Sequence, residues 1–237
     1  MTALQQIKEA FKAHANSEKA SVLQRYFKTG TGEYAEGDIF LGIPVPEQRK
    51  LAKEFYHQLT VKEIETLLKS SFHEHRLTAL FMLVLQFNKT KDEAGKKEII
   101  ELYLDNWERV NNWDLVDSSA PYLLGAYLFD KPKDLLYNLA ESNQLWKQRM
   151  AIIATYYLIK KNSFADTLAL AKILLHHPHD LIHKATGWML REVGNRNPDV
   201  AQTFLAEHYH TMPRTMLRYA IEKYPAQLRQ QFMKGEV

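Results

Sequence analysis

The stretch Arg149-MAIIATYYLI, residues 149–159, shows the sequence pattern on which the fold prediction rests. It places one charged residue ahead of a mostly apolar segment of helical length. Four other segments have the same arrangement, and their first residues lie between 30 and 41 residues apart. They read Arg76-LTALFMLVL, Asp117-SSAPYLLGAYL, Lys184-ATGWMLREV and Arg214-TMLRYAIEK. This spacing is the length of a helix-turn-helix unit, so the sequence predicts repeated pairs of helices.

Helix pairs of this kind cannot bury their apolar faces alone, and stacking them makes the core continuous. The predicted fold class is therefore all-α, a curved superhelix of HEAT-like antiparallel helix pairs with a concave basic face. We expect a single domain over residues 1–237. Residues 29–46 hold four glycines and two prolines and predict a long loop within it. Helices are expected at about 73–88, 92–111, 113–129, 133–141, 144–161, 164–176, 180–195, 198–209, 212–223 and 225–234.

The composition fits this fold and excludes several classes of protein. Of the 237 residues, 46% are hydrophobic and 25% are charged, as in ordinary soluble globular proteins. Glycine (9) and proline (8) are too scarce for a turn-rich sandwich or barrel. The chain has no cysteine, which excludes disulfides, thiolate zinc sites and cysteine nucleophiles. We expect a monomeric cytoplasmic protein with no signal peptide, no membrane segment, no metal and no other cofactor.

The charged residue that begins each repeat is expected to lie in a row along the concave face. That row reads Arg76, Asp117, Arg149, Lys184 and Arg214, and Arg191 and Arg218 lie on the same helix faces. A line of cations suits the phosphodiester backbone of a nucleic acid. The alternative is that these cations belong to solvated helix ends. Cations at helix starts oppose the helix dipole, which favours the first interpretation.

The single acid in the row is accompanied by an aromatic residue. Trp113 and Asp117 are four apart on one predicted helix and therefore share a face. Lys184 and Trp188 repeat this relation with a cation in place of the acid. The alternative is that both tryptophans are core residues. A carboxylate between aromatic walls and beside Arg149 would suit a site that stabilises a cation while it holds a polyanion.

Three segments carry a resemblance to a known family. They are NNWDLVDS (111–118), LWKQRMAI (145–152) and KATGWMLREVGNRNPDV (184–200), and RYF (25–27) with IFLGIPVPEQRKLAKEF (39–55) extends the likeness to the N-terminal part. The chain resembles the AlkD-type DNA glycosylases, a HEAT-like family that excises alkylated purines. It departs from the best-known members at residues 29–38, where its loop looks longer.

The resemblance implies a role for each matching residue. Asp117 would be the catalytic carboxylate, and Trp113 and Trp188 would be aromatic walls beside the lesion. Arg149 would bind a phosphate, and Tyr26 would lie near the lesion strand. The expected DNA-binding residues are Arg149, Lys184, Arg191, Arg76, Arg214, Arg218 and Tyr26.

The function implied is a monofunctional DNA glycosylase that acts on duplex DNA containing alkylated purines. It would hydrolyse the N-glycosidic bond of a cationic N3- or N7-alkylated purine. Asp117 would stabilise the oxocarbenium-like sugar and position the attacking water. The alternative function is a non-catalytic HEAT-like scaffold that binds a DNA structure or another protein.

Overall fold

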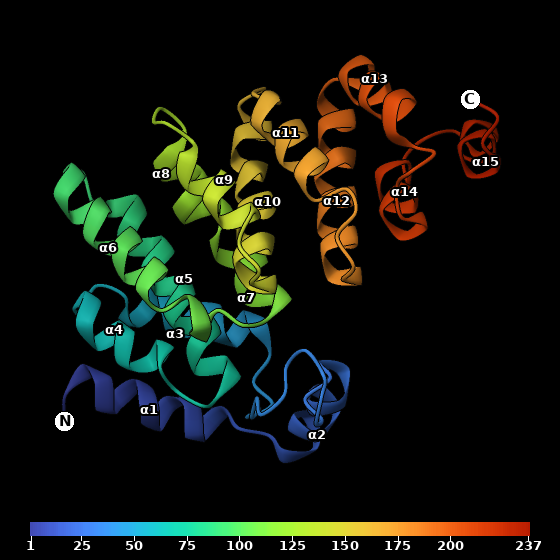
Figure 1. Cartoon of the computed structure of the whole chain (residues 1–237). Helices are drawn as coiled ribbons and strands as arrows, with labels where there is room; N and C mark the ends of the chain where they lie inside the picture. Colours follow the sequence, from blue (N-terminus) through green and yellow to red (C-terminus); the bar gives the residue numbers. More distant parts are fainter. The chain divides into compact units, whose positions relative to one another are not determined.

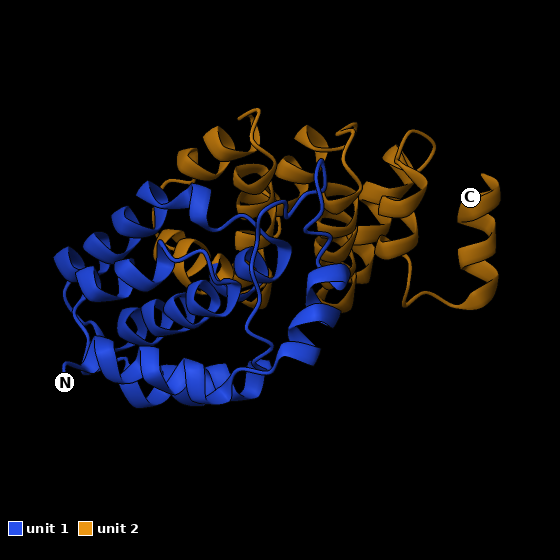
Figure 2. Cartoon of the chain, turned by 90° about the horizontal axis from the view of Figure 1, so that it is seen from below, with its two compact units in different colours: residues 1–119 blue, residues 120–237 orange.

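Helices make up nearly all of the regular structure of this protein. The computed structural model describes all 237 residues, and its one β-type pairing is an isolated bridge between Ile39 and Phe72. The prediction of an all-α protein is therefore confirmed. None of the helices combines the length and apolar character that crossing a lipid bilayer requires. The chain forms two compact units, Met1–Ser119 and Ala120–Val237 (Figure 2).

Unit 1, residues 1–119, is built around its longest helix. Its elements are α1 (Ala3–His14), α2 (Ser17–Tyr26), α3 (Val45–Phe55), α4 (Val61–Leu68), α5 (His73–Lys89), α6 (Glu93–Asp105), the 3-10 turn η1 (Trp107–Arg109) and α7 (Trp113–Ser119). Helix α5 packs against α3, α4, α6 and α7 (Figure 1). Every residue from 73 to 83 is buried, because α5 is covered on all sides rather than along one stripe.

The segment between α2 and α3, residues 27–44, contains no helix and is fastened to α5. The carboxylate of Glu74, which is 1% exposed, accepts hydrogen bonds from the backbone N–H groups of Leu41, Gly42 and Ile43 at 2.9, 2.8 and 3.3 Å. Gly42 has a φ of +80°, and a Cβ there would lie 2.1 Å from the carbonyl oxygen of Asn16. Only glycine fits this position, so the loop has a defined path across α5.

The single helix predicted over residues 113–129 is divided. Helix α7 ends at Ser119 and is followed by the π-helical turn η2 (Pro121–Gly125) and by α8 (Ala126–Leu128). Pro121 has no N–H to donate, and its ring crowds the preceding turn. The helix takes the wider π form here, in which the N–H of Gly125 donates to the carbonyl of Ala120, five residues earlier, at 3.0 Å.

Unit 2, residues 120–237, consists of stacked helix pairs. Beyond η2 and α8 its helices are α9 (Asp134–Ala140), α10 (Leu145–Lys160), α11 (Ala165–Ile173), α12 (Asp180–Arg196), α13 (Pro198–His208), α14 (Arg214–Ala220) and α15 (Ala226–Lys234). Helices α9, α11 and α13 lie beside α10 and α12, and the second helices of successive pairs contact one another in the order α10, α12, α14 (Figure 1). Within this unit the arrangement is the one the repeat spacing predicts.

Glycine allows the close approach of α12 and α14. A Cβ on Gly187 would lie 2.4 Å from the Met216 carbonyl oxygen and 2.6 Å from the Cβ of Tyr219. Distances this short are well inside van der Waals contact, so one helix would have to move. Gly187 directly precedes Trp188, and the crossing therefore fixes the part of α12 that carries this indole.

We expect Gly187→Ala to lower the free energy of unfolding by about 1–3 kcal/mol, despite the better helix propensity of alanine. Urea denaturation followed by circular dichroism measures the change. Gly194→Ala is the matched control in the same helix, because its Cβ would meet the nearest atom at 3.4 Å. That variant should be as stable as the parent or more stable. Equal stability of the two variants would show that α12 and α14 are not held at this distance.

Candidate functional site

In unit 1, three of the predicted site residues gather on and beside α7. Trp113 and Asp117 lie one turn apart on this helix, and both are partly exposed. The ring of Trp113 stacks on Phe27 with centroids 5.3 Å apart and planes 12° apart. Tyr26, 64% exposed, meets the same indole edge-on at 6.4 Å. The end of α2 and the start of α7 thus form an aromatic surface next to a carboxylate.

The end of α7 that carries Asp117 is anchored by a buried phenol. The hydroxyls of Tyr103 and Ser119 lie 3.0 Å apart, and both side chains are buried. Burial, together with the negative charge of Asp117, raises the pKa of Tyr103 above its ordinary value. The phenol therefore stays protonated and serves as a fixed hydrogen-bonding group beside the site.

Beneath the aromatic surface lies a cluster of charges, formed by Asp38, His73, Arg76 and Asp114. Asp38 Oδ2 lies 3.0 Å from Nδ1 of His73, and Asp114 Oδ2 lies 2.8 Å from Nε2 of the same ring. Arg76 Nη2 is 2.6 Å from Asp38 Oδ1. Burial favours the neutral ring, but Asp114 and Asp38 outweigh it and raise the pKa of His73 to about 9. Burial also works against the charge of Asp38, yet the bonds from His73 and Arg76 hold the pKa of Asp38 below its usual range.

The prediction that Arg76 binds DNA is wrong. Its side chain is 2% exposed, and its guanidinium bonds Asp38 and the carbonyls of Ser70 and Ser71, the latter two at 3.3 Å. A buried arginine with a carboxylate partner is held inside by the cost of separating the two charges. The pairing joins residues 38 positions apart in the chain, so no local pattern shows it. The available sign would have been the run of four polar residues, His73 to Arg76, directly before the apolar part of a buried helix.

In unit 2, the predicted cations fall into a register defined by helix starts. Arg149, Lys184 and Arg218 are each the fifth residue of their helix, α10, α12 and α14. Arg214 is the first residue of α14, so Arg218 and not Arg214 continues the row in this unit. Both arginines of α14 are exposed. A hollow of about 550 Å³ lies among Asp180, Lys184, Thr215, Arg218, Tyr219 and Glu222.

Carboxylates also lie among these cations, in addition to the single acid that the sequence places in the row. Lys184 Nζ lies 2.7 Å from Asp180 Oδ2. Arg191 forms an ion pair with Glu222 and a second one, at 3.4 Å, with Glu192. The local charge of this surface is therefore close to balanced, and a DNA backbone would have to compete with carboxylates for it.

Arg149 and Trp188 both have defined intramolecular contacts. Arg149 is buried, and its Nη1 donates to the carbonyl of Leu181, which ties α10 to the start of α12. A phosphate contact at Arg149 stays a prediction. The indole Nε1 of Trp188 donates to Glu192 Oε1 at 3.0 Å, and its ring lies 5.9 Å from that of Tyr156. Trp188 is partly exposed.

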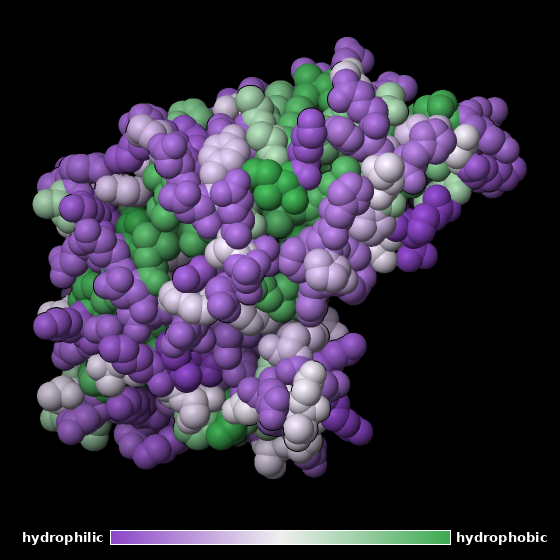
Figure 3. All heavy atoms as spheres, in the orientation of Figure 1, coloured by the Kyte–Doolittle hydropathy of each residue, from purple (hydrophilic) through white to green (hydrophobic).

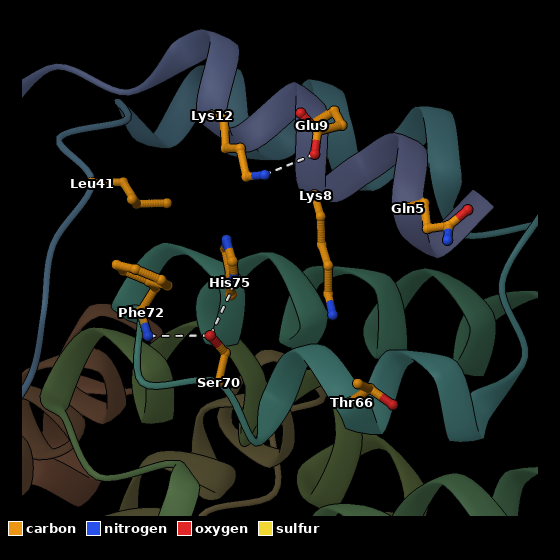
Figure 4. Close-up of a pocket in the computed structure, with 9 residues that line it drawn as sticks. All are labelled: Gln5, Lys8, Glu9, Lys12, Leu41, Thr66, Ser70, Phe72 and His75. Atoms are coloured by element: carbon orange, nitrogen blue, oxygen red, sulfur yellow. Dashed lines mark hydrogen bonds and ion pairs between the residues drawn. The ribbon is translucent and has the colours of Figure 1, made fainter. Parts of the chain in front are cut away.

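A second hollow of about 470 Å³ lies in unit 1, between α1 and the start of α5, and is lined by none of the predicted site residues (Figure 4). Burial and the charges of Lys8 and Arg76 lower the pKa of His75 on its wall to about 4, so this imidazole is neutral at pH 7. No group of three His, Asp or Glu side chains is arranged to hold a metal ion. Hydrophilic side chains cover most of the face shown in Figure 3, and hydrophobic ones appear in patches between them.

Comparisons with known proteins agree with this arrangement. Residues 7–224 match the family described as DNA alkylation repair enzyme. A solved structure titled as a predicted DNA alkylation repair enzyme from Enterococcus faecalis is 19% identical, with a TM-score of 0.72 over 90% of this chain and 98% of the other. AlkD2 from Streptococcus mutans is 15% identical, with a TM-score of 0.56 over 89% of this chain and 99% of the other. No curated protein matches the sequence. The two structures show a shared fold, and the family match extends over nearly the whole chain, so this protein belongs to the DNA alkylation repair enzyme family.

Proposed function

We propose that the protein is a monofunctional DNA glycosylase that removes cationic N3- or N7-alkylated purines from duplex DNA. Membership of a DNA alkylation repair family implies a damaged DNA substrate. The observation that carries the proposal is the placement of the Asp117 carboxylate one turn from Trp113, on a surface that also presents Tyr26.

The proposed reaction needs few catalytic groups. An alkylated purine carries a positive charge, so it leaves with the electron pair of the N-glycosidic bond as a neutral base and needs no protonation. Positive charge then develops on the deoxyribose, where the Asp117 carboxylate stabilises it. Water attacks C1′ as the base departs, and its proton passes to the carboxylate or to solvent. One carboxylate is sufficient for this reaction, whereas an uncharged purine would leave as an anion and would require a second group to protonate it.

Aromatic faces would add to the stabilisation of the cationic sugar and base. A ring face in contact with a cation contributes about 0.5–2 kcal/mol. Trp113, held by Phe27 and Tyr26, offers such a face beside Asp117 in unit 1. The same role for Trp188, whose indole is held by Glu192, rests on the family resemblance alone. Their fixed orientations mean that little rotational freedom is lost when DNA binds.

The backbone contacts are assigned to the cations of unit 2, with Arg76 withdrawn from the set. Arg214 and Arg218 are exposed, and Lys184 and Arg191 are partly exposed. Lys184 and Arg218 line the 550 Å³ hollow, and Arg191 pairs with Glu222 on its wall. Each phosphate that such a cation neutralises releases condensed counterions, so binding should weaken with salt.

The proposal is tested by incubating the protein with duplex DNA that contains 7-methylguanine and then applying heat or alkali. A glycosylase leaves abasic sites, which appear as strand breaks at the lesion. Breaks at the lesion and none in unmodified duplex are the expected result. Tight duplex binding without breaks would instead establish the non-catalytic scaffold.

Neutralising Glu222 should strengthen DNA binding. Glu222→Gln removes a carboxylate next to the proposed phosphate contacts and releases Arg191 from one of its two ion pairs, leaving the one with Glu192. We expect the Kd for plain duplex to fall about two- to fivefold and the plot of log Kd against log salt to become steeper by about one unit. Fluorescence anisotropy over a salt series measures both. Glu207→Gln on α13, an equal change of charge at a residue paired only with its neighbour His208, is the control. An unchanged Kd for Glu222→Gln would remove this surface from the DNA interface.

A further inference from the structure

The interior of unit 1 holds four charges that the proposed reaction does not use. Asp38, His73 and Arg76 are each at most 4% exposed, and the side chain of Asp114 is 13% exposed. Asp38 belongs to the loop 27–44, His73 and Arg76 to α5, and Asp114 to α7. The ring of His73 bonds the loop through Nδ1 and α7 through Nε2, so one imidazole joins three parts of the fold.

The protonation of His73 follows from this geometry. Both ring nitrogens face carboxylate oxygens, which accept hydrogen bonds and donate none, so both nitrogens carry a proton. The ring is therefore an imidazolium, and the cluster balances two positive charges against two negative ones. Buried ion pairs of this kind are often no more stabilising than apolar residues of the same size. Stability alone thus gives a weak reason for the cluster.

The position of the cluster next to the proposed site gives a better reason for its presence. Asp114 lies directly between the two proposed site residues of α7, one position after Trp113 and three before Asp117. A second link runs beside it, since Asn112 accepts the N–H of Trp113 at 2.8 Å and donates to Asp38 Oδ2 at 3.5 Å.

The aromatic layer that holds the indole rests on the same imidazolium. Phe40 stacks on the ring of His73 at 4.5 Å, and Phe27 lies 5.1 Å from it. Phe27 in turn stacks on Trp113. His73 therefore reaches α7 by two routes, through the carboxylate of Asp114 and through the rings beneath Trp113.

We propose that His73 is a positioning residue, which holds α7 through Asp114 and so sets the places of the Trp113 indole and the Asp117 carboxylate. This inference rests on the proposed function. His73 touches neither the sugar nor the base in this role. It affects the rate of the chemical step, because a displacement of about 1 Å in a catalytic group costs up to about 100-fold in rate. It does not affect the strength of DNA binding, since it makes no contact with DNA.

The test compares variants of the full-length protein in single-turnover excision of 7-methylguanine, with enzyme in excess over duplex. We expect Asp114→Ala and His73→Gln to slow excision about 10- to 100-fold while the Kd for duplex changes less than about twofold. Asp114→Asn retains a carbonyl oxygen that accepts the Nε2–H of His73, and it should restore most of the rate.

Glu74→Gln is the matched control. Glu74 adjoins His73, is equally buried and anchors the same loop to the same helix, but all its hydrogen bonds go to the loop and none to α7. It should excise at the parental rate even if its unfolding temperature drops. Parental rates in Asp114→Ala and His73→Gln, or an equal loss in Glu74→Gln, would overturn the inference.

A readout without chemistry separates this inference from the proposed function. The indole N–H of Trp113 gives one of four tryptophan cross-peaks in a ¹H–¹⁵N spectrum, identified by its absence in Trp113→Phe. We expect this peak to shift in Asp114→Ala and to stay in place in Glu74→Gln. A parent that excises nothing would contradict the glycosylase, and the Trp113 peak alone would then decide the positioning role. An unmoved peak in Asp114→Ala would contradict that role whatever the activity.

Discussion

Replacing Asp117 by asparagine should reduce the rate of 7-methylguanine excision about 100- to 1000-fold and change the Kd for the duplex by less than about twofold. Asparagine has the same size and retains one acceptor oxygen, so α7 and the hydrogen bond between Ser119 at its end and Tyr103 should be preserved. It lacks the negative charge that stabilises the sugar as the base leaves. Single-turnover kinetics with alkali-revealed strand breaks measure the rate, and fluorescence anisotropy measures binding.

The control for this prediction is Asp105→Asn, which removes one exposed carboxylate at the end of α6 in the same unit. It changes the net charge by the same amount, and its excision rate should equal that of the parent. A parental rate for Asp117→Asn would remove Asp117 from the chemistry. A loss confined to Kd would make it a binding residue instead.

The free energy of unfolding should fall as the pH rises from about 6.5 to above 9. Below pH 6.5 His73 is protonated in both the folded and the unfolded chain, and its ion pairs contribute fully. Between the ordinary pKa of 6.5 and the folded pKa of about 9, the unfolded chain releases the proton while the folded protein retains it. The contribution lost by the upper end of this range is about 3 kcal/mol at most. Asp38 and Asp114 face the ring, and Arg76 pairs with Asp38.

Urea denaturation at a series of pH values from 6 to about 10 measures this loss, and His73→Gln identifies its source. Glutamine is uncharged and releases no proton in this window, and its single NH₂ group can donate to a carboxylate while its carbonyl oxygen cannot. Its stability should be lower at pH 6 and should depend less on pH, so the two curves should converge near the upper end. Parallel curves for parent and variant would show that His73 is not charged in the folded protein.

Much of the helical architecture could be predicted from the sequence. The expected helices over 144–161 and 180–195 correspond to α10 and α12 within two residues at each end, because apolar periodicity is set by side chains close in sequence. The shared face of Trp113 and Asp117 follows from the same geometry. The division of the helix expected over 113–129 was missed, although Pro121 was visible as the residue that interrupts it.

The amino-acid sequence was enough to predict most of the helices and the candidate carboxylate beside a tryptophan, because both depend on neighbours within a few positions. The spacing of the repeats could also be read from it. Which charged residues face solvent was decided only by the tertiary structure. Arg76 and Arg218 look alike in the sequence pattern, yet Arg76 is buried against Asp38 and Arg218 is exposed. The physical reason is that a charge removed from water needs a partner of opposite charge. For Arg76 that partner is Asp38, which lies in a loop 38 positions away in the chain.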